Sequence, residues 1–146
     1  MKILAVASAG GHWIQLLRLK PAFTDHQLVY MSTKEEFRMM VPDSQYFVIP
    51  DFNRKKKILI FKSLLEIWRS LKSIKPDLVI TTGAAPGLAC ILVGRILGFK
   101  TVWLDSIANV EQLSMSGKIA TYLSNHVYTQ WPELESDKVK YSGKVL

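Results

Sequence analysis

The sequence has a single cysteine among 146 residues, which excludes a disulfide framework. Cys90 lies in the apolar run GLACILVG, where a small buried thiol is the expected role. The first residues, MKILAVAS, form a short apolar stretch that glycines follow, and this fits a first strand better than a secretory signal. We therefore expect a protein of a reducing, cytoplasmic compartment.

Long apolar runs are also missing. The longest one after the start, from Pro86 to Gly94, ends at Arg95, well short of the roughly 20 residues that span a bilayer. Apolar residues make up 49% and charged residues 21% of the chain, which is ordinary globular usage. A chain of 146 residues fills one core but not two, so we expect a single domain over residues 1–146.

Acidic residues are scarce in one stretch. Between residues 54 and 75, eight Lys or Arg accompany one acid, Glu66, and this excess equals the net charge of +7 of the whole chain. A helix over 58–74 would have a wide apolar face with Lys62 and Arg69 opposite. Two interpretations stay open: a core helix with a solvated basic back, or an interfacial helix attracted to anionic lipid. The membrane-facing residues would then be Arg54, Lys55, Lys56, Lys57, Phe61 and Trp68.

Strand-like and helix-like segments alternate along the chain. Runs rich in Val, Ile, Tyr and Trp cover residues 2–8, 26–32, 46–50, 77–83, 100–106 and 126–131, and helical segments cover 13–20, 34–40, 58–74, 87–97 and 116–124. The runs lack polar alternation, which predicts strands that are buried on both faces. Thr33 and Glu36 predict a capping box for the second helix. The predicted fold class is α/β, with a Rossmann-like parallel sheet and helices on both faces.

Ligands of such a sheet bind outside the carboxyl ends of its strands. The segments at these ends are SAGGH, TTGAAPG, DSIANVEQLSMSGK and QWPEL. None contains GxGxxG, and the second strand runs into Ser32 and Thr33 rather than an acid, which argues against nicotinamide or flavin. We expect no cofactor and no metal.

The first loop fits a phosphate or diphosphate. Gly10 and Gly11 permit close backbone approach, and the helix that follows offers free N–H groups. A tight turn without a ligand is the alternative. His12 could take a proton from a hydroxyl or hold a phosphate, or it could simply begin the helix. Gly83 and Gly87 either leave room for a bulky ligand or let two elements pack closely.

Four segments, SAGGH, PDLVITTG, DSIANVEQLSMSGK and TQWPEL followed by KYSGKVL, carry a family resemblance that covers nearly the whole chain. The chain resembles the membrane-associated, acceptor-side subunit of the two-chain N-acetylglucosaminyltransferase of dolichol-linked oligosaccharide synthesis. It equally resembles the bacterial capsule and exopolysaccharide relatives of that subunit. The resemblance implies the N-terminal half of a GT-B glycosyltransferase, with activity only in complex with a donor-binding partner chain.

The resemblance also implies a reaction and a site. The reaction would be inverting transfer from a UDP-sugar to a sugar on a polyprenyl diphosphate, with His12 as base and Glu111 as the second candidate. Acceptor- and diphosphate-binding residues would be Ser8, Gly10, Gly11, Thr82, Gly83, Gly87, Ser106, Ser114, Ser116, Gly117 and Lys118, and partner-facing residues Trp131, Pro132, Glu133, Val145 and Leu146. The chain departs from the family by having Asp105, Ser106 and Asn109 where Glu-Ser and then arginine are common.

Eukaryotic members of the family usually begin with a membrane-spanning helix, whereas this chain begins with a strand. That difference favours a bacterial relative held peripherally on the inner face of the membrane. Two other functions stay open: a non-catalytic scaffold that recruits its partner to the membrane, and a basic nucleotide- or nucleic-acid-binding module. The pI near 9.6 would suit nucleic acid, but the sequence has no recognisable nucleic-acid motif, so we expect no such partner.

Overall fold

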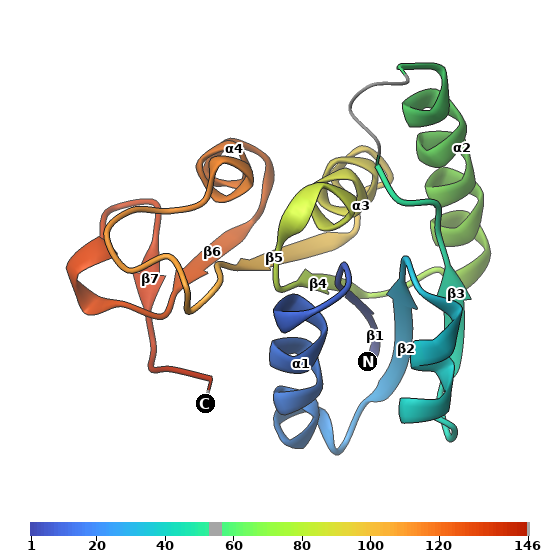
Figure 1. Ribbon diagram of the computed structural model, residues 1–146, viewed down its shortest axis with the longest axis horizontal. Helices are drawn as coiled ribbons and strands as arrows, with labels where there is room; N and C mark the ends of the chain where they lie inside the picture. The colour runs from blue at the N-terminus through green and yellow to red at the C-terminus, as the bar shows by residue number, and fades with distance from the viewer. Residues whose placement is uncertain (53–56, 146) are drawn as a thin grey trace.

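The computed structural model describes residues 1–52 and 57–145 and contains one seven-stranded sheet (Figure 1). The strands are β1 (Lys2–Val6), β2 (Gln27–Ser32), β3 (Gln45–Val48), β4 (Leu78–Thr81), β5 (Lys100–Leu104), β6 (His126–Thr129) and β7 (Lys140–Tyr141). Their spatial order is β3-β2-β1-β4-β5-β6-β7, and every adjacent pair is parallel. The strand order therefore reverses between β1 and β4.

Helices cover both faces of this sheet. They are α1 (Gly11–Arg18), α2 (Lys57–Ile74), α3 (Ala84–Ile96) and α4 (Met115–Leu123), with the short 3₁₀ helices η1 (Lys20–Phe23), η2 (Glu35–Met40) and η3 (Pro132–Leu134). The side chains of α2 and α3 pack on one face, whereas those of α1 pack on the other. The predicted α/β fold, a parallel sheet with helices on both faces, is confirmed.

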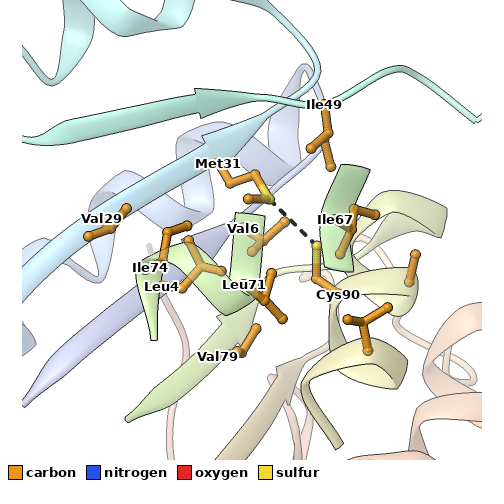
Figure 2. Close-up of a cluster of buried hydrophobic side chains, with 12 residues drawn as sticks. Leu4, Val6, Val29, Met31, Ile49, Ile67, Leu71, Ile74, Val79 and Cys90 are labelled. Carbon is orange, nitrogen blue, oxygen red and sulfur yellow. Dashed lines mark hydrogen bonds between the residues drawn. The ribbon is translucent and has the colours of Figure 1, made fainter. Parts of the chain in front are cut away.

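Alternate residues of the central strand β1 belong to different cores, which explains why its sequence is apolar throughout. Leu4 and Val6 contact the α2 and α3 side, and Ile3 and Ala5 contact the α1 side. Figure 2 shows the first of these cores, where the thiol of Cys90 lies 3.7 Å from the sulfur of Met31. Cys90 is fully buried, as its apolar surroundings in the sequence predict.

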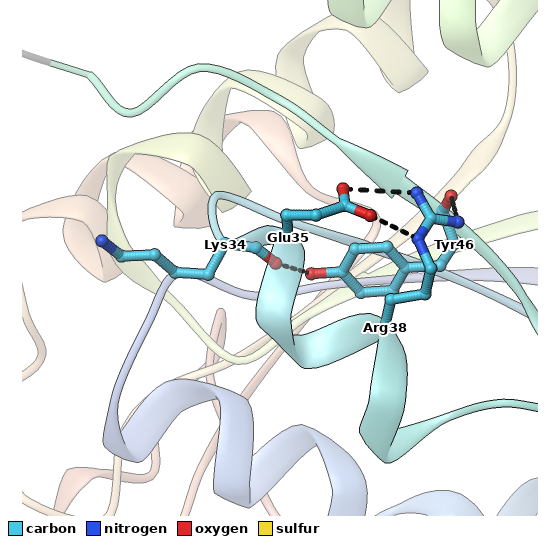
Figure 3. Close-up of polar contacts among 4 residues, drawn as sticks. All are labelled: Lys34, Glu35, Arg38 and Tyr46. Atoms are coloured by element: carbon cyan, nitrogen blue, oxygen red, sulfur yellow. Dashed lines mark hydrogen bonds and ion pairs between the residues drawn. The ribbon is translucent and has the colours of Figure 1, made fainter.

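The predicted capping box at Thr33 and Glu36 is wrong. Residues 35–40 form the 3₁₀ helix η2, whose N-cap is Lys34 and has no side-chain cap. Three contacts fix this segment instead (Figure 3): Arg38 forms an ion pair with Glu35 and donates to the Tyr46 carbonyl oxygen, and the Tyr46 hydroxyl donates to the Lys34 carbonyl oxygen. Hydrogen bonds to Tyr46 of β3 thus hold this segment in place of a local cap.

Helix α3 begins at Ala84, three residues before its predicted start at residue 87. Pro86 falls in the first turn, where its missing N–H removes no intrahelical bond. Ala84 itself has φ 66°, a left-handed value that is uncommon for a residue with a side chain. The helix therefore starts immediately after β4, and its first residues lie beside the end of β1.

Candidate functional site

The reversal of strand order places the loops after β1 and β4 side by side. Two hydrogen bonds connect them: the Nδ1 atom of His12 lies 2.8 Å from the Thr82 carbonyl oxygen, and the Thr82 hydroxyl donates to the His12 carbonyl oxygen over 2.6 Å. In doubly wound sheets this position is where ligands bind. The geometry joins SAGGH and TTGAAPG into one site.

Two helices point their amino termini toward this site. Gly10 is the N-cap of α1 and Gly83 is the N-cap of α3, and neither helix has a side-chain cap. A side chain at Gly10 or Gly11 would meet nothing within 4 Å, so the space in front of α1 is open. Uncapped N–H groups and the positive ends of two helix dipoles favour an anion here. Both glycine loops thus suit a phosphate group.

Gly87 makes a close packing contact instead. A Cβ at this position would lie 2.0 Å from the Thr81 hydroxyl oxygen, and both residues are buried. This contact alone requires a residue without a side chain, since even alanine would displace Thr81. Of the two interpretations of the small residues in this loop, close packing accounts for Gly87. A part of Gly87 in ligand binding stays a prediction.

The loop after β5 is organised around the buried carboxylate of Asp105. Its Oδ1 accepts from Trp103 Nε1 at 3.0 Å and from the Ser114 hydroxyl at 2.6 Å. Its Oδ2 accepts from Asn109 Nδ2 and from the Ser114 backbone N–H, both at 2.9 Å. Asp105 is 2% exposed, and these donors satisfy it in place of water. The residues that depart from the family pattern, Asp105 and Asn109, therefore bond to one another.

Ser114 and Gly117 complete this arrangement at the start of α4. The Ser114 hydroxyl oxygen accepts from the Gly117 N–H at 2.8 Å and so caps the helix. A Cβ at Gly117 would lie 2.5 Å from Asp105 Oδ1. Both residues were expected to bind the acceptor, which stays a prediction, and the structure shows that both hold the loop in shape. Ser116 and Lys118 lie in the first turn of α4, where Lys118 Nζ donates to Gln112 Oε1 at 2.7 Å.

Two buried glutamines link the loops to each other. Gln130 Nε2 donates to the Asp105 carbonyl oxygen at 2.9 Å and to Gln15 Oε1 at 3.2 Å. Gln15 Nε2 in turn lies 3.4 Å from the hydroxyl of Ser106. Sequence reasoning missed both glutamines because nothing in their spacing distinguishes a buried amide from a surface one. A glutamine on the apolar side of a short helix was the only available signal.

Glu111 lies on the loop between β5 and α4, whereas His12 lies in the first turn of α1. Glu111 is exposed and lines a hollow of about 340 Å³ formed by residues 108–112. Within the described part of the chain, no hydrogen bond joins Glu111 to the loops after β1 and β4, whereas His12 stands directly between them. Ser8 is half-buried immediately after β1. The geometry therefore places His12, and not Glu111, at the meeting point of the two loops.

Helix α2 has a buried half and an exposed half. Ile67, Leu71 and Ile74 pack in the core, whereas Phe61 is 78% exposed and Leu65 48% exposed. Figure 1 shows the amino-terminal turns of α2 standing away from the sheet. In the described ranges, no helix combines the length and hydropathy that crossing a bilayer requires.

The expected membrane-facing residues differ in where the structure places them. Phe61 is exposed, as a surface contact requires, but Trp68 is half-buried and packs against the core, with Lys72 Nζ 5.9 Å from its ring centre. Lys57 begins α2. Arg54, Lys55 and Lys56 lie outside the described residues.

The C-terminal segment runs from β7 toward α1 (Figure 1). The Val145 N–H donates to Gln130 Oε1 at 2.8 Å, and Trp131 Nε1 donates to the Ile107 carbonyl oxygen at 2.8 Å. Pro132 and Glu133 in η3 are exposed. Beside this segment an apolar groove of about 230 Å³ is lined by Leu19, Ile80, Val102, Leu104, Tyr128, Thr129 and residues 142–145. Leu146 lies outside the described residues.

Comparison with solved structures defines the class of this fold. The chain superposes on the crystal structure of MurG from Acinetobacter baumannii with a TM-score of 0.79 and 16% sequence identity, covering 97% of this chain and 45% of that one. A UDP-GlcNAc 2-epimerase from Methanocaldococcus jannaschii gives a TM-score of 0.72 at 16% identity, with the same two shares covered. The chain thus spans less than half the length of these proteins. The predicted fold, half of a GT-B architecture, is confirmed.

Sequence comparison identifies the family. The model for "Oligosaccharide biosynthesis protein Alg14 like" matches residues 54–145. The UDP-N-acetylglucosamine transferase subunit ALG14 of Homo sapiens is 31% identical over 183 positions, which take in 100% of this chain and 83% of the human protein. The subunit from Rattus norvegicus is also 31% identical, over 99% of this chain and 82% of its own length. The chain belongs to the Alg14-like family of oligosaccharide biosynthesis proteins.

Proposed function

We propose that this chain is the acceptor-side subunit of a two-chain inverting glycosyltransferase. It would bind a polyprenyl-diphosphate-linked sugar at the membrane and recruit a partner that binds the UDP-sugar. The observation that carries this proposal is the edge of the sheet where β1 and β4 end, at which two uncapped helix amino termini and His12 meet. An anion-binding edge with a proton acceptor beside it suits a carrier diphosphate next to a reacting hydroxyl.

A donor-binding partner chain would supply the other lobe of this architecture. The likeness to 45% of the MurG chain supports this division, since it leaves the second lobe of that architecture unmatched. The C-terminal segment and its apolar groove would offer that partner a surface on the face of the sheet that carries α1. Trp131 contacts this segment, since Lys144 Nζ lies 3.8 Å from its ring centre. Trp131, Pro132, Glu133, Val145 and Leu146 would face the partner.

Membrane contact would come through the amino-terminal half of α2. Phe61 and Leu65 present apolar surface to solvent, and the exposed Lys62 lies between them in sequence. Apolar residues interspersed with cations favour the surface of anionic lipid, where each cation near the membrane contributes about 1 kcal/mol. We infer peripheral attachment to the inner face of a bacterial membrane in capsule or exopolysaccharide synthesis.

Reconstitution with the partner tests catalysis. The isolated chain should transfer no sugar from a UDP-sugar to a polyprenyl-diphosphate-linked acceptor, and adding the donor-binding partner should restore transfer. His12→Ala should then reduce kcat by about 10²- to 10⁴-fold, the usual contribution of a general base. His126→Ala is the matched control, because His126 is an exposed residue at the start of β6. Full activity of His12→Ala would exclude His12 as the base and leave either Glu111 in that role or the scaffold function.

Glu111→Ala tests the second candidate for the base. Since Glu111 forms no hydrogen bond to the loops after β1 and β4 within the described residues, we expect the complex with this variant to keep its activity within about threefold, a much smaller loss than a base would cause. A loss as large as that expected for His12→Ala, with His12→Ala itself active, would transfer the role to Glu111. Strong transfer by the isolated wild-type chain would contradict the two-chain proposal as a whole.

Vesicle flotation tests the membrane surface separately. The wild-type chain should float with vesicles that contain phosphatidylglycerol, and it should release as salt rises, because screening weakens surface attraction. A Phe61→Ser, Leu65→Ser double variant should stay at the bottom of the gradient. Ile96→Ser is the control, since Ile96 is 63% exposed at the other end of the helical layer. Equal flotation of both variants would exclude α2 as the attachment surface.

A further inference from the structure

The contact between His12 and Thr82 determines which imidazole nitrogen carries the proton. The Nδ1 atom lies 2.8 Å from the Thr82 carbonyl oxygen, and a carbonyl oxygen can only accept a hydrogen bond. Nδ1 must therefore donate. In the neutral side chain the lone pair then lies on Nε2, since a neutral imidazole has one N–H.

The Nε2 atom of His12 is the ring nitrogen that remains available to accept a proton. In the described part of the chain it makes no hydrogen bond, and it is not among the buried polar atoms that lack a partner, so it keeps contact with solvent. The tautomer that the carbonyl selects thus leaves a proton acceptor in contact with solvent. Among the described residues, no carboxylate forms a hydrogen bond or ion pair with the ring.

Thr82 also fixes the main chain of the same residue. Its hydroxyl donates to the His12 carbonyl oxygen at 2.6 Å, although the two residues are 70 positions apart. His12 is therefore attached to Thr82 at two points, one on its ring and one on its backbone. Two attachments to one buried residue restrict both the position of α1 and the orientation of the ring.

Gly83 provides the space that the ring occupies. A Cβ on Gly83 would lie 2.8 Å from both Cε1 and Nδ1 of His12, closer than side chains approach one another. Gly83 also has φ 129°, a value that side-chain-bearing residues rarely adopt. The imidazole thus fills the volume that any other residue at position 83 would need.

We propose that Thr82 and Gly83 are positioning residues that hold His12 in the Nδ1–H tautomer with Nε2 facing the acceptor. This role rests on the proposed function of His12 as base. In the reaction, the acceptor oxygen forms its bond to the anomeric carbon with its own electron pair, and its proton goes to Nε2. The bond from that carbon to UDP breaks, and the pair leaves on the phosphate oxygen. Nδ1–H stays bonded to Thr82 throughout.

Nitrogen NMR of the isolated chain tests the tautomer without any need for activity. Long-range proton–nitrogen spectra of the neutral form should show His12 protonated at Nδ1, with His26 and His126 as internal references. Thr82→Ser keeps the hydroxyl and should keep this pattern. Thr82→Val keeps the carbonyl oxygen but loses the hydroxyl that holds the His12 backbone against it, so the Nδ1 contact should loosen and a mixture of tautomers should appear. Gly83→Ala crowds the ring and should also give a mixture. Wild-type His12 protonated at Nε2 would overturn the proposal.

Kinetics of the two-chain complex provide the second test. Thr82→Val should lower kcat by about tenfold, a part of what a general base contributes, with KM for the acceptor unchanged within about twofold. Thr82→Ser should restore kcat. If Thr82→Val shifts the tautomer but His12→Ala retains full activity, the positioning is supported and the proposed base is wrong. If Thr82→Val changes neither tautomer nor kcat, Thr82 has no positioning role.

Discussion

Ser114 donates twice to the carboxylate of Asp105, once from its hydroxyl to Oδ1 and once from its backbone N–H to Oδ2. The same hydroxyl oxygen accepts from the Gly117 N–H, so one side chain ends the loop and begins α4. A buried anion and a helix cap therefore depend on a single serine. This arrangement makes the shape of the loop after β5 sensitive to very small changes.

Ser114→Ala should destabilise the protein by about 2–4 kcal/mol. The variant loses a cap, which is worth roughly 0.5–2 kcal/mol, and it removes one donor from a buried carboxylate, which costs roughly 1–3 kcal/mol. Urea unfolding gives the difference in free energy. Ser116→Ala two residues later is the control and should change the free energy of unfolding by less than about 0.5 kcal/mol. Equal effects of the two variants would contradict the role given to Ser114.

Two glycine variants separate steric packing from helix propensity. Gly117→Ala brings a Cβ to 2.5 Å from Asp105 Oδ1 and 2.9 Å from the Ser114 hydroxyl oxygen, so we expect a loss of about 2 kcal/mol or more. Gly11→Ala meets nothing within 4 Å and exchanges glycine for a better helix former, so it should be neutral or stabilising by up to about 1 kcal/mol. Thermal unfolding of the pair measures both effects.

Cys90 should make the protein less stable at alkaline pH. Burial raises the pKa of its thiol far above the ordinary value near 8.5. The unfolded chain therefore releases a proton that the folded chain retains. The contribution of the protonated Cys90 thiol to the free energy of unfolding is fully present below about pH 8.5. Above that pH it declines by about 1.4 kcal/mol per pH unit. Burial also raises the pKa of Tyr30 and Tyr46, so these two side chains lower the free energy of unfolding further above about pH 10.

Denaturant unfolding between about pH 8 and pH 10 tests this dependence. Cys90→Ala removes the thiol and should flatten the curve over that interval, although it lowers stability at every pH because it leaves a small cavity. The test is the slope of the free energy of unfolding against pH, and not the absolute free energy. An unchanged slope in the variant would show that another group dominates. A thiol reagent should react with the wild-type protein only as it unfolds.

Lys75 offers a stabilising substitution. It follows the last residue of α2 with φ 49°, and its N–H donates to the Leu71 carbonyl oxygen at 2.9 Å. Glycine adopts this left-handed conformation without a steric penalty, so Lys75→Gly should raise the free energy of unfolding by about 1 kcal/mol. Lys72→Gly, within the same helix, should instead lower it by about 1 kcal/mol. Chemical unfolding of both variants checks the opposite signs.

The sequence predicts the sheet and its site-bearing edge because both follow from local patterns. Apolar runs without alternation indicated buried parallel strands, and the two glycine loops marked where the chain turns from strand to helix. The two-residue strand β7 was missed, since Lys140 and Tyr141 carry no apolar run to announce them. The capping box failed because a distant partner, Tyr46, competes for the same segment.

The detailed contacts of the site could not be predicted for a related reason. Asp105, Gln15 and Gln130 are polar residues that are buried only because other segments cover them. Their hydrogen bonds join positions as far as 115 residues apart, and no local pattern encodes such a pairing. His12 was found because glycines precede it, whereas its partner Thr82 required the relative placement of β1 and β4.

Gln130 has a consequence for how the protein is made. Its side-chain amide donates to Asp105 and Gln15 and accepts a hydrogen bond from the Val145 N–H. Segments from near both ends of the chain therefore contact the same amide group. On a ribosome, the first strands can pair while the last residues are still inside the exit tunnel. The edge that carries the candidate site becomes whole only once residue 145 has emerged. A nascent chain thus gains its sheet before the contacts that complete this edge.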